Sequence, residues 1–343
     1  MKWIFYIILS ISLSLANIIH ETGELSEFIG GDSPGSSYDN WVSHVTEGIA
    51  SEGFNDYGPD WLDVQTTGFG NYNKLEFEDP ILNYWEHIFS GFILGDTTLV
   101  DSLLQDSIES FYYELVIFED TVYNQVFHII REQLDTSFID LNQSDNDLDD
   151  VVGSFRNGWG MYIVNPQATR EQVVIQVPHP CDDFIAPYIA IDIFLETNAF
   201  AFMINGAGRE VLWTEVGNYS NSKSLSDPSR YSNTIFQKFQ EVAVHPLIGS
   251  NPHWPLVFAI HSFDNESHED RKSIIVAAGG QNSFTTKPIR DITDDHFDII
   301  NFTSEYPIDE GQFGNTNSLH ITDYYEVFYD DHCVFDNGET EFP

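Results

Sequence analysis

Short runs of apolar residues that alternate with helical patterns are the feature that most restricts the fold of this chain. The runs are VVIQV (173–177), AFAFMIN (199–205), PLVFAIH (255–261) and SIIVAA (273–278). Helical spacing separates the first three of them, over residues 184–196 and 233–244. Strands that are apolar throughout are typical of parallel or mixed sheets covered by helices on both faces. The pattern therefore predicts an α/β domain with a mixed, largely parallel sheet flanked by helices over residues 151–343.

The preceding part of the chain lacks this alternation, and we expect it to pack on the α/β core. Residues 17–75 are rich in Gly, Ser, Asp and Asn without a sustained period, which indicates an irregular arm. From residue 79 to about residue 134 the apolar side chains follow helical spacing. Two stripes carry that interpretation: Leu82, Trp85, Ile88 and Phe89, then Val122, Val126, Ile129 and Ile130. Residues 17–150 are thus predicted to form an irregular arm and a helical region.

An acidic segment, QSDNDLDD (143–150), separates these two regions. Its alternating aspartates have the spacing of a calcium-binding loop. However, Asp150 and Arg156 stand where such a loop needs a glycine and a bidentate glutamate. The segment is therefore interpreted as a solvated linker.

The chain carries 55 acidic and 13 basic side chains, which give it a formal net charge of −42. Such an excess of carboxylates repels nucleic-acid phosphates and anionic lipids, so neither is expected as a partner. Apolar residues make up 42% of the chain, which is enough for a packed core in spite of the charge. A secreted protein of a saline environment would have this charge whatever its function.

Residues 1–16 have the features of a signal peptide. A basic residue precedes the apolar run 3–15, which is shorter than a membrane span, and small residues precede a cleavage site after Ala16. No later stretch approaches about 18 consecutive apolar residues, so no membrane insertion is expected after cleavage. We therefore expect a secreted or periplasmic protein, in a compartment that permits a disulfide between Cys181 and Cys333.

The segment VVIQVPHPCDD contains the first candidate ligands of a metal site. His179 stands directly after the predicted strand, between two prolines that stiffen the turn. Asp182 follows three residues later, so both side chains can point at one ion. Neutral imidazole and carboxylate are ligands that catalytic Zn²⁺ accepts, commonly with a third protein ligand and a water.

His261 is the predicted third ligand, because it ends the run PLVFAI and should emerge at the same carboxyl edge of the sheet. His245 and His253 precede it, but both stand next to prolines in turn-like sequence. They are interpreted as rim residues or as hydrogen-bond donors behind the ligands. The alternative to a metal site is that the two histidines have a structural role only, at the ends of their strands.

Hydrolysis at such a site also requires a cation and a base. Arg209 follows the run AFAFMIN, so it should lie at the same sheet edge, either near the developing oxyanion or in an ordinary ion pair. Glu326, in the apolar segment DYYEVFY, is the predicted base, because partial desolvation raises the pKa of a carboxyl group toward the useful range. Asp323 and Glu210 are the alternative bases.

Taken in this order, these residues resemble the motif of the zinc carboxypeptidase-like superfamily, which includes metallocarboxypeptidases and N-formylglutamate amidohydrolases. The family pattern is His-x-x-Glu after a strand, then a second His and a late catalytic Glu. The matching positions here are His179, Asp182, His261 and Glu326, with Asp in place of the first Glu. The resemblance covers roughly residues 155–335. It implies a phosphorylase/hydrolase-like fold, one Zn²⁺ per chain, and cleavage of an amide or peptide bond in a small molecule or peptide by a zinc-bound water.

Two other functions fit parts of the sequence. The string GDSPG (31–35) has the form of the GxSxG elbow of serine hydrolases, but it lacks the flanking strand and helix. Pro34 also has no N–H to donate to an oxyanion hole, which argues against serine hydrolysis. The alternative that remains is a non-catalytic secreted binding or surface protein with a hydrolase-like fold. The sequence leaves the substrate and the oligomeric state open.

Overall fold

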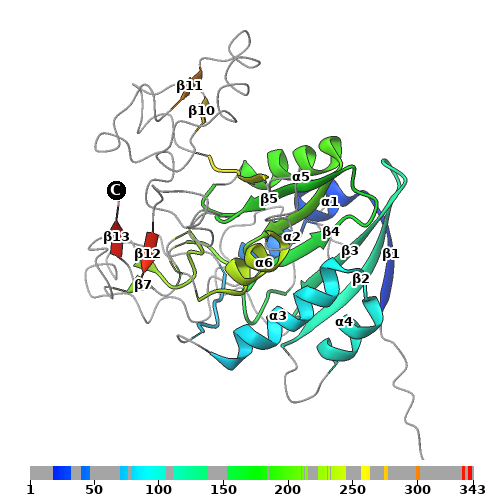
Figure 1. Ribbon diagram of the computed structural model, residues 1–343, viewed down its shortest axis with the longest axis horizontal. Helices are drawn as coiled ribbons and strands as arrows, with labels where there is room; N and C mark the ends of the chain where they lie inside the picture. Colours follow the sequence, from blue (N-terminus) through cyan, green and yellow to red (C-terminus); the bar gives the residue numbers. More distant parts are fainter. Residues whose placement is uncertain are drawn as a thin grey trace, which may run out of the picture.

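The computed structural model describes one mixed sheet, the helices that cover it and three short pairs of strands (Figure 1). The described residues are 18–31, 40–46, 70–75, 79–105, 111–136, 153–183, 185–209, 211, 213–214, 223–229, 231, 233–244, 256–262, 274–276, 299–301, 334–336 and 339–341. The predicted signal peptide, the acidic segment 143–150 and Cys333 lie outside them, so the predicted cleavage, linker and disulfide stay predictions.

A seven-stranded sheet in the order β1-β2-β3-β4-β6-β5-β9 forms the centre of the described structure. Its strands are β1 (Ile19–Gly23), β2 (Tyr113–Asp120), β3 (Gln125–Glu132), β4 (Met161–Val164), β5 (Arg170–Val177), β6 (Ala199–Ile204) and β9 (Leu256–Ala259). The pairs β1–β2, β6–β5 and β5–β9 are parallel, and the other three pairs are antiparallel. The mixed sheet and the α/β class are therefore confirmed, but only half of the pairings are parallel, whereas a largely parallel sheet was predicted.

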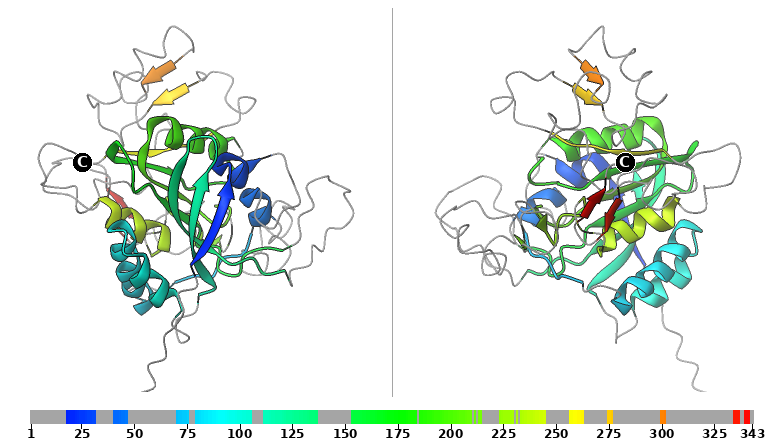
Figure 2. Two further views of the ribbon diagram at one scale, coloured as in Figure 1. Left: turned by 90° about the vertical axis from the view of Figure 1, so that its right-hand side faces the viewer. Right: turned by 60° about the vertical axis from the view of Figure 1, so that its left-hand side comes forward.

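Helices cover both faces of this sheet, which gives three layers (Figure 2). The helices are α1 (Leu25–Gly30), α2 (Trp41–Thr46), α3 (Pro80–Ile93), α4 (Thr97–Leu104), α5 (Ala186–Thr197) and α6 (Ile235–Val244). On one face α3, α4 and α6 pack with Tyr162 and Met203 of the sheet. On the other face α1, α2 and α5 pack with Ile163 and Phe202. No helix in the described part of the chain is both long and apolar enough to span a membrane.

The elements predicted after residue 170 agree with the structure. The runs 173–177, 199–205 and 255–261 correspond to β5, β6 and β9, and the two helical patterns between them correspond to α5 and α6. The fourth run, 273–278, contains β10 (Ile274–Val276), which pairs with β11 (Ile299–Asn301) instead of joining the large sheet. The remaining short pairs are β7 (Trp213–Thr214) with β8 (Lys223–Ser224), and β12 (Val334–Asp336) with β13 (Glu339–Glu341).

The helix predicted up to residue 134 is wrong for its second half. Helical spacing does hold over α3 and α4, and α3 begins at Pro80, where the Asp79 carboxylate accepts a hydrogen bond from the Ile81 N–H. The chain then forms the hairpin β2–β3. The Asp120 carboxylate stabilises the turn of this hairpin by accepting hydrogen bonds from the N–H groups of Val122 and Tyr123. Apolar residues that fill both faces of a buried strand also match a helical period by chance.

The predicted arm also contains regular structure. β1, α1 and α2 lie within residues 17–75, which were expected to be irregular. β1 pairs with β2, and Arg131 of β3 holds it there by donating two hydrogen bonds, of 2.6 and 2.9 Å, to the Glu21 carboxylate. Strands from both sides of residue 150 thus join the same sheet.

Candidate metal centre

The carboxyl ends of β6, β5 and β9 lie at the same edge of the sheet, because these three strands are parallel neighbours. The chain leaves β5 toward α5 on one face and leaves β6 toward α6 on the opposite face. Loops that part to opposite faces open a crevice between adjacent strands, which is where ligands bind in open α/β sheets. Functional side chains are therefore expected directly after β5, β6 and β9.

The turn after β5 brings His179 and Asp183 to the same side. The Asp183 N–H donates to the His179 carbonyl at 3.0 Å, and the Ala186 N–H donates to the Asp183 carbonyl at 2.7 Å as α5 begins. In a turn closed from residue i+4 to residue i, the first and last side chains are neighbours. His179 Nδ1 accordingly lies 3.3 Å from Asp183 Oδ2, and both side chains are buried.

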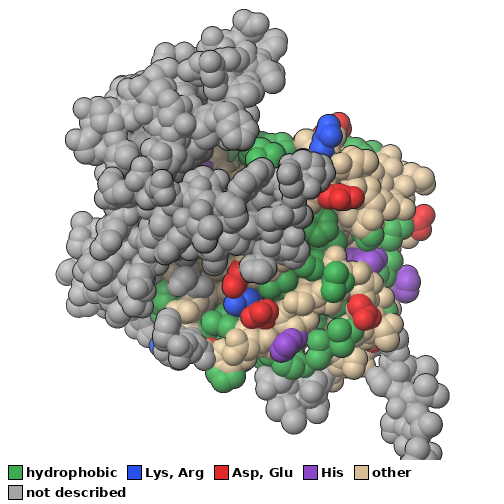
Figure 3. Space-filling model, in the orientation of Figure 1, with side chains coloured by type: hydrophobic (Ala, Val, Ile, Leu, Met, Phe, Trp, Pro, Cys, Tyr) green, Lys and Arg blue, Asp and Glu red, His purple; other side chains and the backbone are tan. Residues whose placement is uncertain are grey.

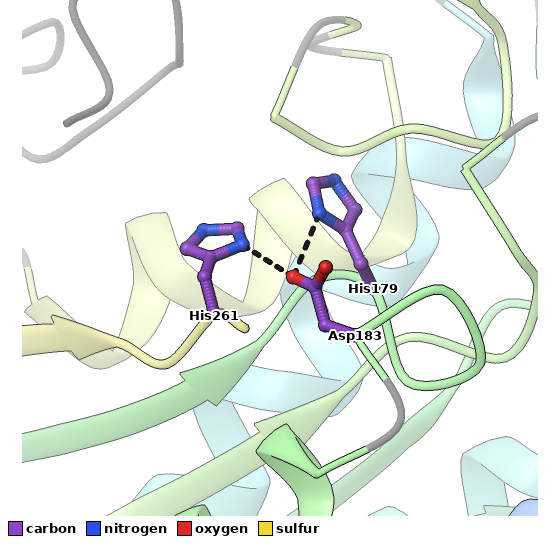
Figure 4. Close-up of side chains that lie close together, drawn as sticks. All are labelled: His179, Asp183 and His261. Atoms are coloured by element: carbon purple, nitrogen blue, oxygen red, sulfur yellow. Dashed lines mark hydrogen bonds and ion pairs between the residues drawn. The ribbon is translucent and has the colours of Figure 1, made fainter. Parts of the chain in front are cut away.

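His261 reaches the same carboxylate from β9. The β5–β9 ladder continues past the strand end, because the Ile260 N–H donates to the Gln176 carbonyl at 2.9 Å. His261 Nδ1 lies 2.7 Å from Asp183 Oδ2, and the rings of His261 and His179 are 4.9 Å apart between centroids. Figure 4 shows both rings beside the Asp183 carboxylate. The His261 side chain remains 28% exposed, so the group can be reached from solvent.

Among the described residues, His179, Asp183 and His261 form a group that could hold a metal ion. Their ligand atoms all lie within 4.8 Å of one another. Ligands about 2.0–2.2 Å from one tetrahedral ion stand roughly 3.4 Å apart, so small side-chain movements suffice. Two imidazole nitrogens and a carboxylate oxygen are also a donor set that Zn²⁺ accepts, with a position left for water or substrate. The residues present fit a metal ion in both spacing and chemistry.

Asp183 joins the two histidines in place of Asp182, which was predicted as the carboxylate ligand. The Asp182 carboxylate points elsewhere and accepts the backbone N–H of Arg209 at 2.7 Å. The turn closes at Asp183, the fourth residue after His179, so the side chain of Asp183 and not that of Asp182 lies beside the imidazole. Since the two aspartates are adjacent, i+4 spacing was the signal that could have identified Asp183.

The structure brings Arg209 to the same edge of the sheet, at the end of β6, where its side chain is exposed. Its backbone contact with Asp182 ties the loop after β6 to the loop after β5. Glu326, Asp323, Glu210, His245 and His253 all lie outside the described residues.

Asp227 is a site residue that sequence reasoning missed. Its Oδ1 lies 3.0 Å from His179 Nε2, on the side of the ring opposite Asp183, and its side chain is buried. The loop that carries it, between β8 and α6, has the composition of an ordinary polar turn. No spacing in the sequence relates Asp227 to His179, so their meeting depends on the tertiary fold alone.

The buried charges fix the protonation states of the group. Burial lowers the pKa of His179, but the carboxylates of Asp227 and Asp183 outweigh it and raise that pKa to about 9. Burial raises the pKa of Asp183, yet its contacts with the two histidines hold that pKa below its usual value. For His261, burial lowers the pKa and outweighs the bond to Asp183, while charge on His179 lowers it further. These effects favour a proton on each ring nitrogen of His179, and a metal ion bound at Nδ1 would take the place of the proton there.

Comparison of the chain with protein-family models, with curated proteins and with solved structures finds no match in any of the three. The resemblance to the zinc carboxypeptidase-like superfamily accordingly stays a hypothesis. Two histidines and an aspartate converge on one point at the carboxyl edge of the mixed sheet.

Proposed function

We propose that this protein is a secreted, zinc-dependent hydrolase that cleaves an amide or peptide bond. The observation that carries the proposal is the meeting of His179 and His261, 82 positions apart in sequence, at one oxygen of Asp183. An ion bound there would act as a Lewis acid that polarises a carbonyl group and activates water near neutral pH. His179, Asp183 and His261 would hold that ion, and the exposed side of His261 gives access to substrate.

The surroundings of the site support the same reaction. Three layers around a mixed sheet, with the group at the strand ends, agree with the phosphorylase/hydrolase-like fold that the resemblance implies. Arg209 supplies a cation at this edge, suited to a carboxylate of the substrate or to a developing oxyanion. Glu326 is the proposed base. A small molecule or peptide is the proposed substrate class, as the resemblance implies, and the partly exposed His261 side chain leaves the group open to such a substrate.

Metal analysis of the purified protein tests this proposal. We expect about one zinc ion per chain after dialysis against zinc-free buffer, and its loss in the variants His179→Ala and His261→Ala. The variant Asp182→Asn is the matched control, because Asp182 contacts a backbone N–H and not the histidines. Wild-type protein without bound metal would contradict the proposal, and iron in place of zinc would redirect it toward oxygen chemistry.

The base is tested once zinc has been found. Glu326→Gln should retain zinc and lose turnover in a screen of N-acylated amino acids and short peptides, because an amide cannot take up the proton that a carboxylate accepts. Arg209→Ala should raise KM most for substrates that carry a free carboxylate. Full turnover by the Glu326 variant would remove this residue from the base role and leave the metal site unaffected.

A second function is favoured by one observation. Both nitrogens of His179 already contact carboxylates, at 3.3 Å and 3.0 Å, so the polar network is complete without an ion. The protein would then be a non-catalytic secreted binding or surface protein in which the group only stabilises the loops. The metal analysis separates the two functions, since this one predicts no zinc in wild-type protein and a lower Tm for His179→Ala.

A further inference from the structure

His179 differs from His261 in that a second carboxylate is bonded to its other ring nitrogen. Asp227 Oδ1 lies 3.0 Å from His179 Nε2, and the two side chains are 6% and 8% exposed. Asp183 Oδ2 lies 3.3 Å from the opposite nitrogen, Nδ1. The imidazole is thus held between two carboxylates that belong to different loops, and only the Asp183 side faces His261.

The carboxylate of Asp227 is held firmly in its own loop. Its Oδ1 also accepts the Ser229 N–H at 2.8 Å, and the Asp227 carbonyl accepts the Tyr231 N–H at 2.9 Å. From α6, the Gln237 side chain donates to the carbonyl of Pro228. A carboxylate fixed in this way keeps its position when the imidazole beside it changes its own partners.

A second set of contacts ties this loop to the end of β6. The Asn205 side-chain amide donates to the Ser226 carbonyl at 3.0 Å, and the Ser226 hydroxyl lies 2.7 Å from the carbonyl oxygens of Gly208 and Val211. The Asn205 N–H in turn donates to the Val177 carbonyl at the end of β5 at 3.0 Å. Asp227 is therefore placed against His179 by contacts with the ends of β6 and β5, and β5 is the strand that leads into His179 and Asp183.

We infer that Asp227 is a positioning residue that keeps the proton of His179 on Nε2 and so directs a metal ion to Nδ1. The inference rests on the proposed metal site. An imidazole that donates Nε2–H to a carboxylate presents an unprotonated Nδ1, and such a hydrogen bond also fixes the ring plane and raises the basicity of the ligand nitrogen. Nδ1 is the nitrogen that faces Asp183 and His261.

The test uses ¹¹³Cd²⁺ as a probe for the metal and protein labelled with ¹⁵N-histidine. We expect a one-bond ¹¹³Cd–¹⁵N coupling to Nδ1 of His179 in the wild-type protein. Asp227→Ala should bind Zn²⁺ about 10–100-fold more weakly, and its cadmium coupling should spread to Nε2. Asp227→Asn should restore coupling to Nδ1, because the amide oxygen can still accept the Nε2–H.

Asp120→Ala is the matched control for loss of a buried aspartate. Asp120 accepts three backbone N–H groups at the turn of β2, at the sheet edge opposite the metal group, so its removal should lower Tm without changing zinc affinity. Unchanged affinity and unchanged Nδ1 coupling in Asp227→Ala would overturn the role of Asp227 and leave the metal site intact. Wild-type coupling through Nε2 would also overturn it. Absence of cadmium binding in wild-type protein would overturn this inference together with the proposed function.

Discussion

At the scale of single residues, the adjacent aspartates 182 and 183 have separate tasks. Asp183 contacts two imidazoles through one oxygen, whereas Asp182 contacts a backbone N–H at the exposed edge of the site. Asp183→Asn should lower zinc affinity by at least about 100-fold, because a neutral amide replaces an anionic ligand. Asp182→Asn should leave the affinity nearly unchanged, because Asp182 bonds to the backbone N–H of Arg209 and to neither histidine. Competition with a chromogenic chelator measures both, and equal losses in the two variants would contradict the assignment.

Glu132 is a second buried carboxyl group whose protonation the structure constrains. It accepts the N–H groups of Asn157 and Gly158 at 2.6 and 3.0 Å and so holds the loop before β4. Burial raises its pKa, and although these hydrogen bonds lower it, the result is a pKa of about 8. Between the ordinary value and this one, only the folded state binds the proton, so folding stability due to Glu132 falls as pH rises.

Glu132→Gln resembles the protonated carboxyl group and isolates this effect. The free energy of unfolding of wild-type protein, minus that of Glu132→Gln, should decrease from pH 5 to pH 8 and then level off. Urea unfolding at a series of pH values measures the difference. A difference that stays constant or increases with pH would show that Glu132 is ionised throughout. Glu132→Ala should cost about 1–3 kcal/mol for each backbone N–H that loses its acceptor.

The sequence predicted the histidines of the site but not all of their partners. His179 and His261 each follow an apolar run, so the parallel sheet alone brought them to one edge. The choice between Asp182 and Asp183 depended on which N–H closes the turn, which local spacing does not determine. Asp227 comes from a loop with no pattern, and only the packing of α6 and β6 places it against His179.

At the scale of elements, the loop before β4 and the end of β6 approach with almost no space between their backbones. A Cβ atom on Gly206 would stand 2.5 Å from the Gly160 nitrogen and 2.6 Å from the Gly158 carbonyl carbon. Gly158 and Gly160 both have positive φ angles, of 65° and 96°, so the loop depends on glycine at these positions. This contact supports the strand end from which Asn205 and Arg209 extend.

Gly206→Ala should therefore destabilise the protein more than the same substitution at a glycine that follows a helix. We expect the free energy of unfolding to fall by about 1–3 kcal/mol, because the added methyl group meets backbone on two sides. Gly95→Ala is the control, since Gly95 has a φ of 73° but nothing within 4 Å of an added Cβ, and it should cost about 1 kcal/mol. Thermal unfolding of both variants measures this, and a smaller loss at Gly206 than at Gly95 would contradict the close approach.

The elements after residue 170 were predictable, and those before it were less so. β5, β6 and β9 are uninterrupted apolar runs with helical patterns between them, and each pattern has one interpretation. In β2 and β3 the apolar residues face helices on both sides of the sheet, so their spacing fits a helix as well as a strand. β1 has only five residues, and it is held in the sheet by β2 and Arg131, which are distant from it in sequence.

At the scale of the whole molecule, the net charge of −42 works against the compact state. On the described part of the face in Figure 3, acidic side chains are scattered among polar and apolar ones. Raising NaCl from about 0.01 M to about 0.15 M shortens the Debye length from about 30 Å to about 8 Å, which screens this repulsion. Tm should therefore rise by several degrees. KCl should have the same effect as NaCl, because screening depends on ionic strength. A fall in Tm would mean that attractive ion pairs, such as Arg131 with Glu21, dominate instead.

The proposed metal ion would bind where the loops after β5 and β9 meet. Anomalous diffraction at the zinc edge, from crystals of the purified protein grown with Zn²⁺, would locate this ion. We predict one strong peak about 2.0–2.2 Å from His179 Nδ1, His261 Nδ1 and an Asp183 oxygen. No peak at saturating zinc, or a strong peak only at surface carboxylates, would contradict a metal centre at the edge of this sheet.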